Sequence, residues 1–188
     1  MPNLTIFDLD NTLLSGDSDR AWGQYIVEKK IVSDEFLLES ENFYNSYYDG
    51  SLDIHSFLDF CLKPLMENEW SDLIELRKGF IDNKIKPMIL NKAVEAVELS
   101  KSKGPVVIAT ATNSFVTRPI ADLFGIKNLI ATEFIVKDNK FTGEVDGVPC
   151  FREGKVQKVE EWIKENGYNL LDATFYSDSF NDLPLLEK

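Results

Sequence analysis

Two carboxylates follow a short apolar segment near the start of the sequence. Residues 4–7 read Leu-Thr-Ile-Phe, and residues 8–12 read Asp-Leu-Asp-Asn-Thr. If the apolar segment is a buried strand, Asp8 and Asp10 lose hydration and repel one another, and neither has a basic neighbour in sequence. Such a pair is tolerated at the open end of a strand where a cation lies between the carboxylates. Ligands bind at that end of the strands in open α/β sheets, so we expect a functional site there.

Strand and helix patterns alternate along most of the chain, which predicts an α/β fold with a parallel sheet and right-handed crossovers. Apolar and β-branched residues predict buried strands at 4–8, 106–109, 129–132 and 173–177, and a hairpin formed by 134–136 and 141–145. Helical spacing predicts helices at 89–101, 114–124 and 155–166. Between the first two strands the pattern is helical only, from about residue 17 to residue 80, with helices at 34–48, 53–65 and 70–81.

Bulk properties limit the classes of partner. The net charge of −12 argues against a general nucleic-acid or anionic-membrane binder, because both need a basic surface. Cys61 and Cys150 are interpreted as reduced thiols rather than a disulfide framework. No basic segment followed by an apolar stretch opens the chain, and no apolar run approaches the ~20 residues of a spanning helix. We expect a cytoplasmic protein with a small-molecule partner; its oligomeric state is left open.

Three of the predicted strands end in polar clusters, and a parallel sheet brings those ends to one edge. These ends, together with the helix that follows Gly154, supply Asp8, Asp10, Thr110, Lys155, Asp178 and Asp182. Carboxylate oxygens without nearby Cys or His suit Mg²⁺. A carboxylate beside that ion can attack a phosphoryl group, and a second carboxylate can act as general acid and base. A hydroxyl and an ammonium can neutralise the phosphoryl oxygens.

These residues resemble the four-motif signature of the haloacid dehalogenase (HAD) superfamily, over essentially the whole chain. The helical insertion between the first two motifs resembles a C1-type cap, which places the sequence near the phosphoserine phosphatase-like branch (subfamily IB). The resemblance implies a Rossmann-like parallel sheet flanked by helices, formed by residues 1–14 and 86–188, and a helical cap domain at 15–85.

The resemblance also implies a role for each motif residue. Asp8 is the expected nucleophile and Asp10 the general acid/base, and Mg²⁺ is held by the Asp8 side chain, the Asp10 carbonyl and Asp178. The expected phosphate-binding residues are Thr110, Ala111 and Lys155; the supporting residues are Thr12, Asn181 and Asp182; and the candidate substrate residues are Asp17, Asn113, Arg118 and Arg152. Asp17 stands where phosphoserine phosphatases place a Glu that contacts the substrate amine. Because this residue is an Asp instead of a Glu, the resemblance supports an amine-bearing substrate less strongly than it supports the aspartyl-phosphate reaction.

Three hypotheses follow. The first is a Mg²⁺-dependent phosphomonoesterase that hydrolyses a small phosphoserine-like or histidinol-phosphate-like metabolite through an aspartyl-phosphate on Asp8, with a phosphotransferase as a close variant. The second is a receiver-type signalling domain, which shares an acidic cluster, a Thr and a Lys. The third is a truncated, weakly catalytic remnant that binds a ligand or partner, because the sequence stops at Lys188 while family members continue for another strand and helix.

Several candidates also have a purely structural interpretation. By spacing alone Lys155 reads as a surface lysine, and Thr110 reads as a helix cap at a strand end. Arg118 and Arg152 each read as partners in surface salt bridges. His55, the one histidine, is interpreted as a packing or surface residue, which excludes histidine-based triads and zinc sites.

Overall fold

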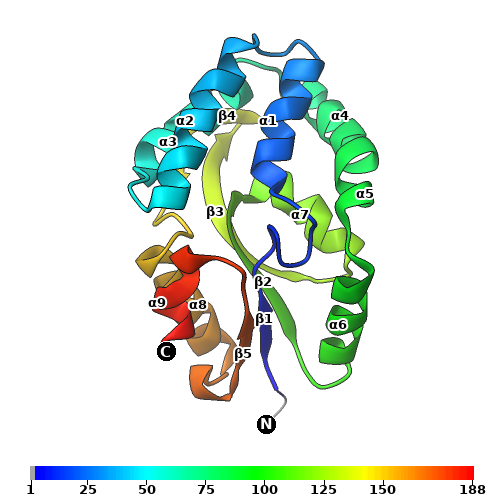
Figure 1. The fold of residues 1–188 in the computed structure, drawn as a ribbon, viewed down its shortest axis with the longest axis vertical. Coiled ribbons are helices and arrows are strands. Elements are labelled where there is room, and N and C mark those ends of the chain that lie inside the picture. The colour runs from blue at the N-terminus through cyan, green and yellow to red at the C-terminus, as the bar shows by residue number, and fades with distance from the viewer. Residues whose placement is uncertain (1–2) are drawn as a thin grey trace.

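A five-stranded sheet forms the centre of the computed structural model, which describes residues 3–188 (Figure 1). The strands are β1 (Thr5–Phe7), β2 (Val106–Asn113), β3 (Asn128–Lys137), β4 (Lys140–Asp146) and β5 (Thr174–Tyr176), in the order β4-β3-β2-β1-β5. β1 pairs in parallel with both β2 and β5, β2 pairs in parallel with β3, and β3 pairs antiparallel with β4. The predicted α/β fold with a mostly parallel sheet is confirmed.

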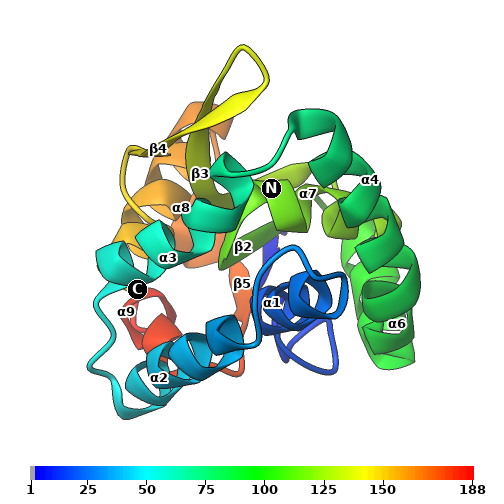
Figure 2. The ribbon, with the colours of Figure 1, turned by 90° about the horizontal axis from the view of Figure 1, so that it is seen from above.

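Helices cover the sheet and gather beyond the ends of its parallel strands. They are α1 (Ser18–Glu28), α2 (Glu35–Asp49), α3 (Ile54–Met66), α4 (Trp70–Phe80), α5 (Lys86–Met88), α6 (Asn91–Lys101), α7 (Ser114–Leu123), α8 (Glu153–Asn166) and α9 (Leu183–Leu186). Figure 1 shows α1 to α4 beyond the end of β1, and Figure 2 shows them from above, spread around the strand ends. Within the described part of the chain, no helix is both long and apolar enough to span a bilayer.

Two apolar clusters cover the two faces of the sheet, because successive side chains of a strand point to opposite faces. Phe7 and Ile108 belong to one cluster, and Ile6 and Val107 belong to the other. The cluster that contains Phe7 continues into α1, α3 and α4, so one apolar core joins the sheet to the helices beyond its edge. The division into a core domain and a cap domain at residues 15–85 stays a prediction.

The strands β2 and β3 differ from the predicted boundaries. The strand predicted at 129–132 and the first arm of the predicted hairpin are one strand, because β3 pairs with β2 along its first half and with β4 along its second, where Glu133 lies opposite Asp146. β2 continues past residue 109 because a register shift brings Asn113 opposite Thr132. Pairing along the neighbouring strand, rather than local sequence, sets these boundaries.

The helix predicted to end at residue 81 also continues. It passes through a π-helical turn, Ile81–Ile85, into α5, and the main-chain N–H of Lys86 donates to the carbonyl of Ile81. Pro87 lies in the first turn of α5, directly after the π-helical turn, and it has no N–H to donate to the helical path. The helical path therefore ends at Met88 rather than at residue 81, where the sequence predicts its end.

Phe80 is the residue on which the junction between helices and sheet most depends. It is fully buried, and its ring centroid lies 5.2 Å from that of Trp22 and 5.7 Å from that of Tyr25. We expect Phe80→Ala to lower the free energy of unfolding by about 3–5 kcal/mol, because a cavity replaces these contacts. Urea denaturation measures it. The control Leu99→Ala, at a side chain that is 58% exposed on α6, should change stability by less than about 0.5 kcal/mol.

Candidate active site

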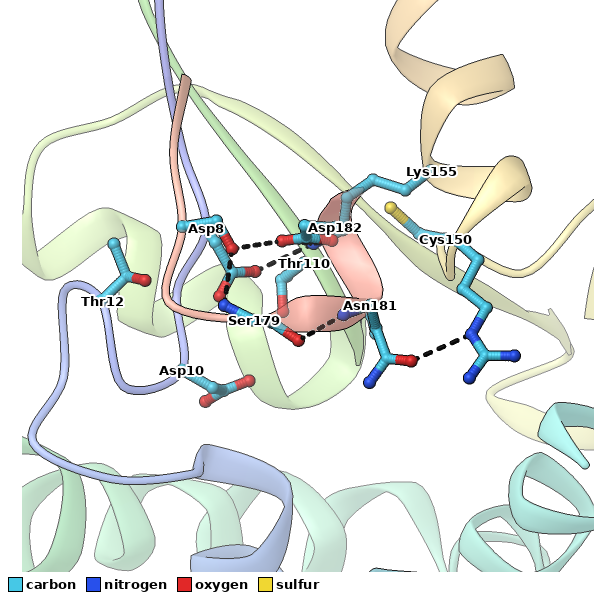
Figure 3. Close-up of polar contacts among 12 residues, drawn as sticks. Asp8, Asp10, Thr12, Thr110, Cys150, Lys155, Ser179, Asn181 and Asp182 are labelled. Atoms are coloured by element: carbon cyan, nitrogen blue, oxygen red, sulfur yellow. Dashed lines mark hydrogen bonds and ion pairs between the residues drawn. The ribbon is translucent and has the colours of Figure 1, made fainter. Parts of the chain in front are cut away.

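Lys155 lies between two buried carboxylates at the carboxyl end of β1. Its ammonium donates to Asp8 Oδ1 at 3.0 Å and to Asp182 Oδ2 at 2.8 Å. The exposed fractions are 3% for Lys155, 6% for Asp8 and 3% for Asp182. Ser177 Oγ donates to the same Asp182 oxygen at 2.6 Å. Figure 3 shows these side chains converging from β1, from the first turn of α8 and from the turn after β5.

Burial and the neighbouring charges have opposing effects on the pKa values of Asp8 and Lys155. Burial raises the pKa of Asp8 to about 7; Lys155 opposes this rise, and Asp182 and Asp10 add to it. Burial alone would lower the pKa of Lys155, but its contacts with Asp8 and Asp182 outweigh burial and hold that pKa above its ordinary value. Lys155 is therefore a permanent cation beside Asp8, and it can also bind the oxygens of an anionic ligand.

A tight turn before α8 delivers Lys155 to the interior. Gly154 N donates to the Phe151 carbonyl at 2.9 Å, and a Cβ on Gly154 would lie 2.1 Å from the carbonyl oxygen of Pro149. Any side chain at this position would push the start of α8 away from the preceding loop. The requirement for glycine explains how Lys155, one residue later, becomes one of the buried residues of α8.

The Asp10 carboxylate points away from this group and is held separately. The main-chain N–H of Ser18 donates to Asp10 Oδ1 at 2.6 Å, and Thr112 Oγ1 donates to Asp10 Oδ2 at 2.9 Å. Burial raises the pKa of Asp10 to about 7, Asp17 adds to the rise, and the hydrogen bonds from Ser18 and Thr112 oppose it. A carboxyl group with a pKa near neutrality can both donate and accept a proton at physiological pH.

Asp178 completes the acidic edge. Thr12 Oγ1 donates to Asp178 Oδ1 at 3.2 Å, and Asp178 N lies 3.2 Å from the same hydroxyl, to which it donates. These two bonds tie the loop after β1 to the loop after β5. The predicted supporting role of Thr12 is consistent with this contact.

The donor atoms at this edge fit Mg²⁺ by their chemistry. The carboxylates of Asp8 and Asp178 and the carbonyl of Asp10 are oxygen donors, which Mg²⁺ prefers. Among residues 3–188, no three His, Cys, Asp or Glu side chains gather as a metal site. In the donor set that the family resemblance implies, Asp10 contributes its main-chain oxygen, and its carboxylate is held by Ser18 and Thr112 instead. The ion itself stays a prediction.

One cavity, between the strand ends and helices α2 and α3, brings most of the predicted residues together. Its lining includes Asp8, Asp10, Asp17, Ala111, Asn113, Lys155, Asp178, Asn181 and Asp182. Thr110 is behind the wall: it is 1% exposed, and its hydroxyl accepts from the main-chain N–H of Thr112 at 3.2 Å.

Two predicted substrate residues lie outside the cavity lining. Arg118 donates to the carbonyl of Lys127 at 2.9 Å and pairs with Asp122 at 3.0 Å, so it closes the end of α7. Arg152 donates to Asn181 Oδ1 at 2.9 Å and to the carbonyl of Gly50 at 2.8 Å. The guanidinium groups are occupied by protein oxygens, so neither residue is placed to bind a ligand in the cavity.

Thr112 and Asp19 are among the polar residues of the lining that sequence reasoning did not assign to the site. The polar run after the second predicted strand was visible, but the register shift that brings Thr112 to Asp10 was not. Asp19 lies in the first turn of α1, where an acidic residue normally only favours helix formation. Here it faces the cavity, and its carboxylate accepts a hydrogen bond from Cys61 Sγ at 3.5 Å.

Asp17 and Asp19 carry an electrostatic penalty. Burial raises the pKa of each to about 7, and the proximity of another carboxylate adds to each rise. No lysine or arginine forms a salt bridge with either residue in the part of the chain that the structure describes. These carboxylates therefore destabilise the fold when they ionise, unless a cation enters the cavity.

We expect Asp19→Asn to stabilise the protein above neutral pH. The pKa of Asp19 is raised from 3.8 to about 7, so the unfolded chain ionises first and wild-type stability falls as pH rises from about 4 to about 7. The amide lacks this penalty. After discounting for partial exposure and screening, the gain at pH 8 is about 1 kcal/mol, or a Tm rise of about 3 °C.

Thermal melts from pH 4 to pH 8 measure this gain, which should shrink toward zero near pH 4. Asp146→Asn, at an exposed residue, is the matched control and should show no such trend. A loss of stability in Asp19→Asn at pH 8 would contradict the expected penalty.

The sequence matches the family model described as haloacid dehalogenase-like hydrolase over residues 5–187. It is 40% identical over 192 residues to a histidinol-phosphatase from Neisseria meningitidis serogroup C (strain 8013), an alignment that covers 99% of this chain and 86% of that protein. The alignment spans the strand ends and the helices that line the cavity.

Solved structures give the same picture of the fold. A protein of unknown function from Bordetella pertussis Tohama I superposes with a TM-score of 0.89 at 36% identity, covering all of this chain and 87% of that one. A phospho-aspartyl intermediate analogue of phosphoserine phosphatase superposes with a TM-score of 0.70 at 22% identity, covering 98% of this chain and 82% of that one.

Proposed function

The chain belongs to the haloacid dehalogenase-like hydrolase family, as a phosphatase of its phosphoserine phosphatase-like branch, and we propose that it hydrolyses a small phosphate monoester through an aspartyl-phosphate on Asp8. The observation that carries the proposal is the buried contact between Asp8 and Lys155, with a second carboxyl group, Asp10, lining the same cavity. The receiver-domain alternative is dropped, because the family model describes a hydrolase over residues 5–187.

The residues divide the reaction into two steps. In the first, an Asp8 carboxylate oxygen attacks phosphorus, the bond to the ester oxygen breaks, and Asp10 gives its proton to the leaving oxygen. In the second, Asp10 takes a proton from water, the water oxygen attacks phosphorus, and the bond to Asp8 breaks to release inorganic phosphate. Lys155 neutralises phosphoryl oxygens in both steps, because its ammonium already lies at Asp8.

We propose Mg²⁺ as the metal cofactor, held by the carboxylates of Asp8 and Asp178 and the carbonyl of Asp10. When bound, the ion offsets the negative charge of the nucleophile and of the phosphoryl oxygens. Within the described range 3–188, the cavity lining at this edge contains three carboxylates, Asp8, Asp178 and Asp182, but only one ammonium group, that of Lys155. This excess of negative charge supports a divalent cation.

The charge of the cavity favours a substrate with a cationic group. Among the described residues, Lys155 is the one basic residue of the lining, and it is bound to Asp8 and Asp182. A carboxylate on the substrate, as in phosphoserine, would have no cationic partner and would approach Asp17 and Asp19. An amine or imidazole would instead offset the charge of those two residues.

The part of the wall that α2 and α3 form is largely aromatic and apolar. It includes Phe43, Tyr44, Tyr47 and Phe57, from α2 and α3. Aromatic side chains stack on flat rings and attract cations. Together with the 40% identical histidinol-phosphatase, this wall supports a histidinol-phosphate-like substrate over a phosphoserine-like one.

Asp8→Asn tests the chemistry. The amide has the size of the carboxylate but cannot attack phosphorus, so we expect Mg²⁺-dependent phosphate release from an aryl phosphate to fall by at least about 10³-fold. Acid-quenched protein from a burst with labelled substrate should carry phosphate in the wild type and none in the variant. Asp146→Asn, outside the cavity lining, should keep wild-type turnover. Retained turnover in Asp8→Asn would exclude the covalent mechanism.

A substrate panel tests the specificity. With Mg²⁺ present, kcat/KM for histidinol phosphate should exceed that for phosphoserine by about tenfold or more, because like charges placed together cost several kcal/mol. Asp19→Asn should narrow this ratio while it leaves turnover of an aryl phosphate unchanged. A preference for phosphoserine in the wild type would show that the acidic wall does not select the substrate.

A further inference from the structure

Arg152 has a strained backbone at the entrance to α8. Its φ of 50° and ψ of −120° are rare for a residue with a side chain, and such a conformation persists only where surrounding contacts impose it. Arg152 does not line the cavity. The contacts that impose the conformation are therefore structural, and they lead to both sides of the site.

The guanidinium of Arg152 joins the turn after β5 to the end of α2. Nε donates to Asn181 Oδ1 at 2.9 Å, a bond drawn in Figure 3, and Nη2 donates to the carbonyl of Gly50 at 2.8 Å. Gly50 caps α2 with a left-handed conformation, φ 81°, so its carbonyl marks the end of that helix. The guanidinium also lies 5.0 Å above the centroid of the Phe151 ring, which lines the cavity.

Tyr47 makes a second link between the same two segments. Its hydroxyl lies 2.8 Å from Ser179 Oγ, within hydrogen-bond distance, and its carbonyl accepts from Asn181 Nδ2 at 3.5 Å. Its ring centroid lies 6.1 Å from that of Phe151. The end of α2 is therefore held against the turn after β5 by one arginine and one tyrosine.

Hydrogen bonds continue from this turn to the nucleophile. Ser179 N donates to Ser177 Oγ at 3.0 Å, and Ser177 Oγ donates to Asp182 Oδ2 at 2.6 Å. Asp182 and Asp8 share the ammonium of Lys155. A continuous path of polar contacts thus runs from α2, through the turn at 177–182, to Asp8.

We propose that Arg152 is a positioning residue, which, together with Tyr47, sets the turn at 177–182 so that Asp178 and Asp182 take their places only while the end of α2 is docked. The proposal rests on the proposed phosphatase reaction for its kinetic consequence. Its structural part, the dependence of this turn on α2, stands apart from any activity. The fork of the guanidinium matters here, because one ammonium cannot reach both oxygens in the same geometry.

The test compares Arg152→Lys with Arg77→Lys. Arg77 is a matched control, because it also donates to a backbone carbonyl, that of Phe115 at 2.7 Å, and lies over an aromatic ring, but it is outside the cavity lining. We expect Arg152→Lys to lower kcat by about tenfold or more with KM within about twofold, because small displacements of catalytic groups are costly. Arg77→Lys should leave both constants unchanged.

Hydrogen exchange gives a readout that does not need activity. The amide hydrogens of peptides covering 177–182 and 46–51 should exchange about tenfold faster in Arg152→Lys than in the wild type. Exchange in the strands of the sheet should not change, because the proposed contacts are local. Tyr47→Phe removes only a hydroxyl and should change the same two segments, whereas Tyr168→Phe, whose ring stacks on Trp162, should change neither. Tyr47→Phe also carries the test if Arg152→Lys fails to fold.

Two kinds of outcome overturn the proposal. A rise in KM with kcat retained would mean that Arg152 contacts the substrate. Exchange that rises throughout the protein, or in neither segment, would mean that the contacts do not position the turn. If the wild type releases no phosphate from any substrate, the proposed function fails, while the exchange experiment still decides whether α2 sets the turn.

Discussion

The structure depends most on the ammonium of Lys155, because this charge allows Asp8 and Asp182 to share the interior of the molecule. Removing one partner of a buried ion pair typically costs about 3–5 kcal/mol, since the other charge is left unpaired. The contact also fixes three elements relative to one another: the end of β1, the start of α8 and the turn after β5. Two carboxylates face one ammonium, so the group keeps a negative charge. This excess of negative charge destabilises the fold, and it also favours the binding of a cation at the site.

The ends of the parallel strands were predictable from local sequence, because β-branched residues are followed at once by polar ones. The motifs of Asp8 and Asp178 were found in this way, and the α/β sheet was confirmed. Lys155 was not predictable from spacing, because a lysine after a glycine reads as a surface residue, and only the family resemblance placed it at Asp8. Thr112 was missed because its contact with Asp10 depends on a register shift between β2 and β3, a property of the pairing rather than of either strand.

Stability and specificity oppose one another in the cavity. Asp17 and Asp19 ionise at a cost to the fold, because burial raises the pKa of each to about 7 and no salt bridge within residues 3–188 offsets their charge. Evolution commonly accepts such a cost where the group serves function. A cationic group on the substrate would stabilise the ionised forms of both carboxylates. A carboxylate on the substrate would give no such stabilisation. If the proposed specificity holds, the same pair of side chains both destabilises the fold and selects the substrate.

The helices that line the cavity and the strand ends that hold Asp8 and Asp178 are not independent parts. One apolar core runs through both, and Arg152 bonds to the end of α2 and to the turn that contains Asp178 and Asp182. Substitutions at Phe43 or Phe57, which line the cavity, should have little effect on the hydrogen bonds that connect the end of α2 to Asp8, because those rings take no part in them. Under the proposal for Arg152, a change that shifts the end of α2 moves Asp182 and, with it, Lys155, which donates to Asp8. Substrate range in such an architecture can diversify along the middle of α2 and α3 more readily than at the end of α2.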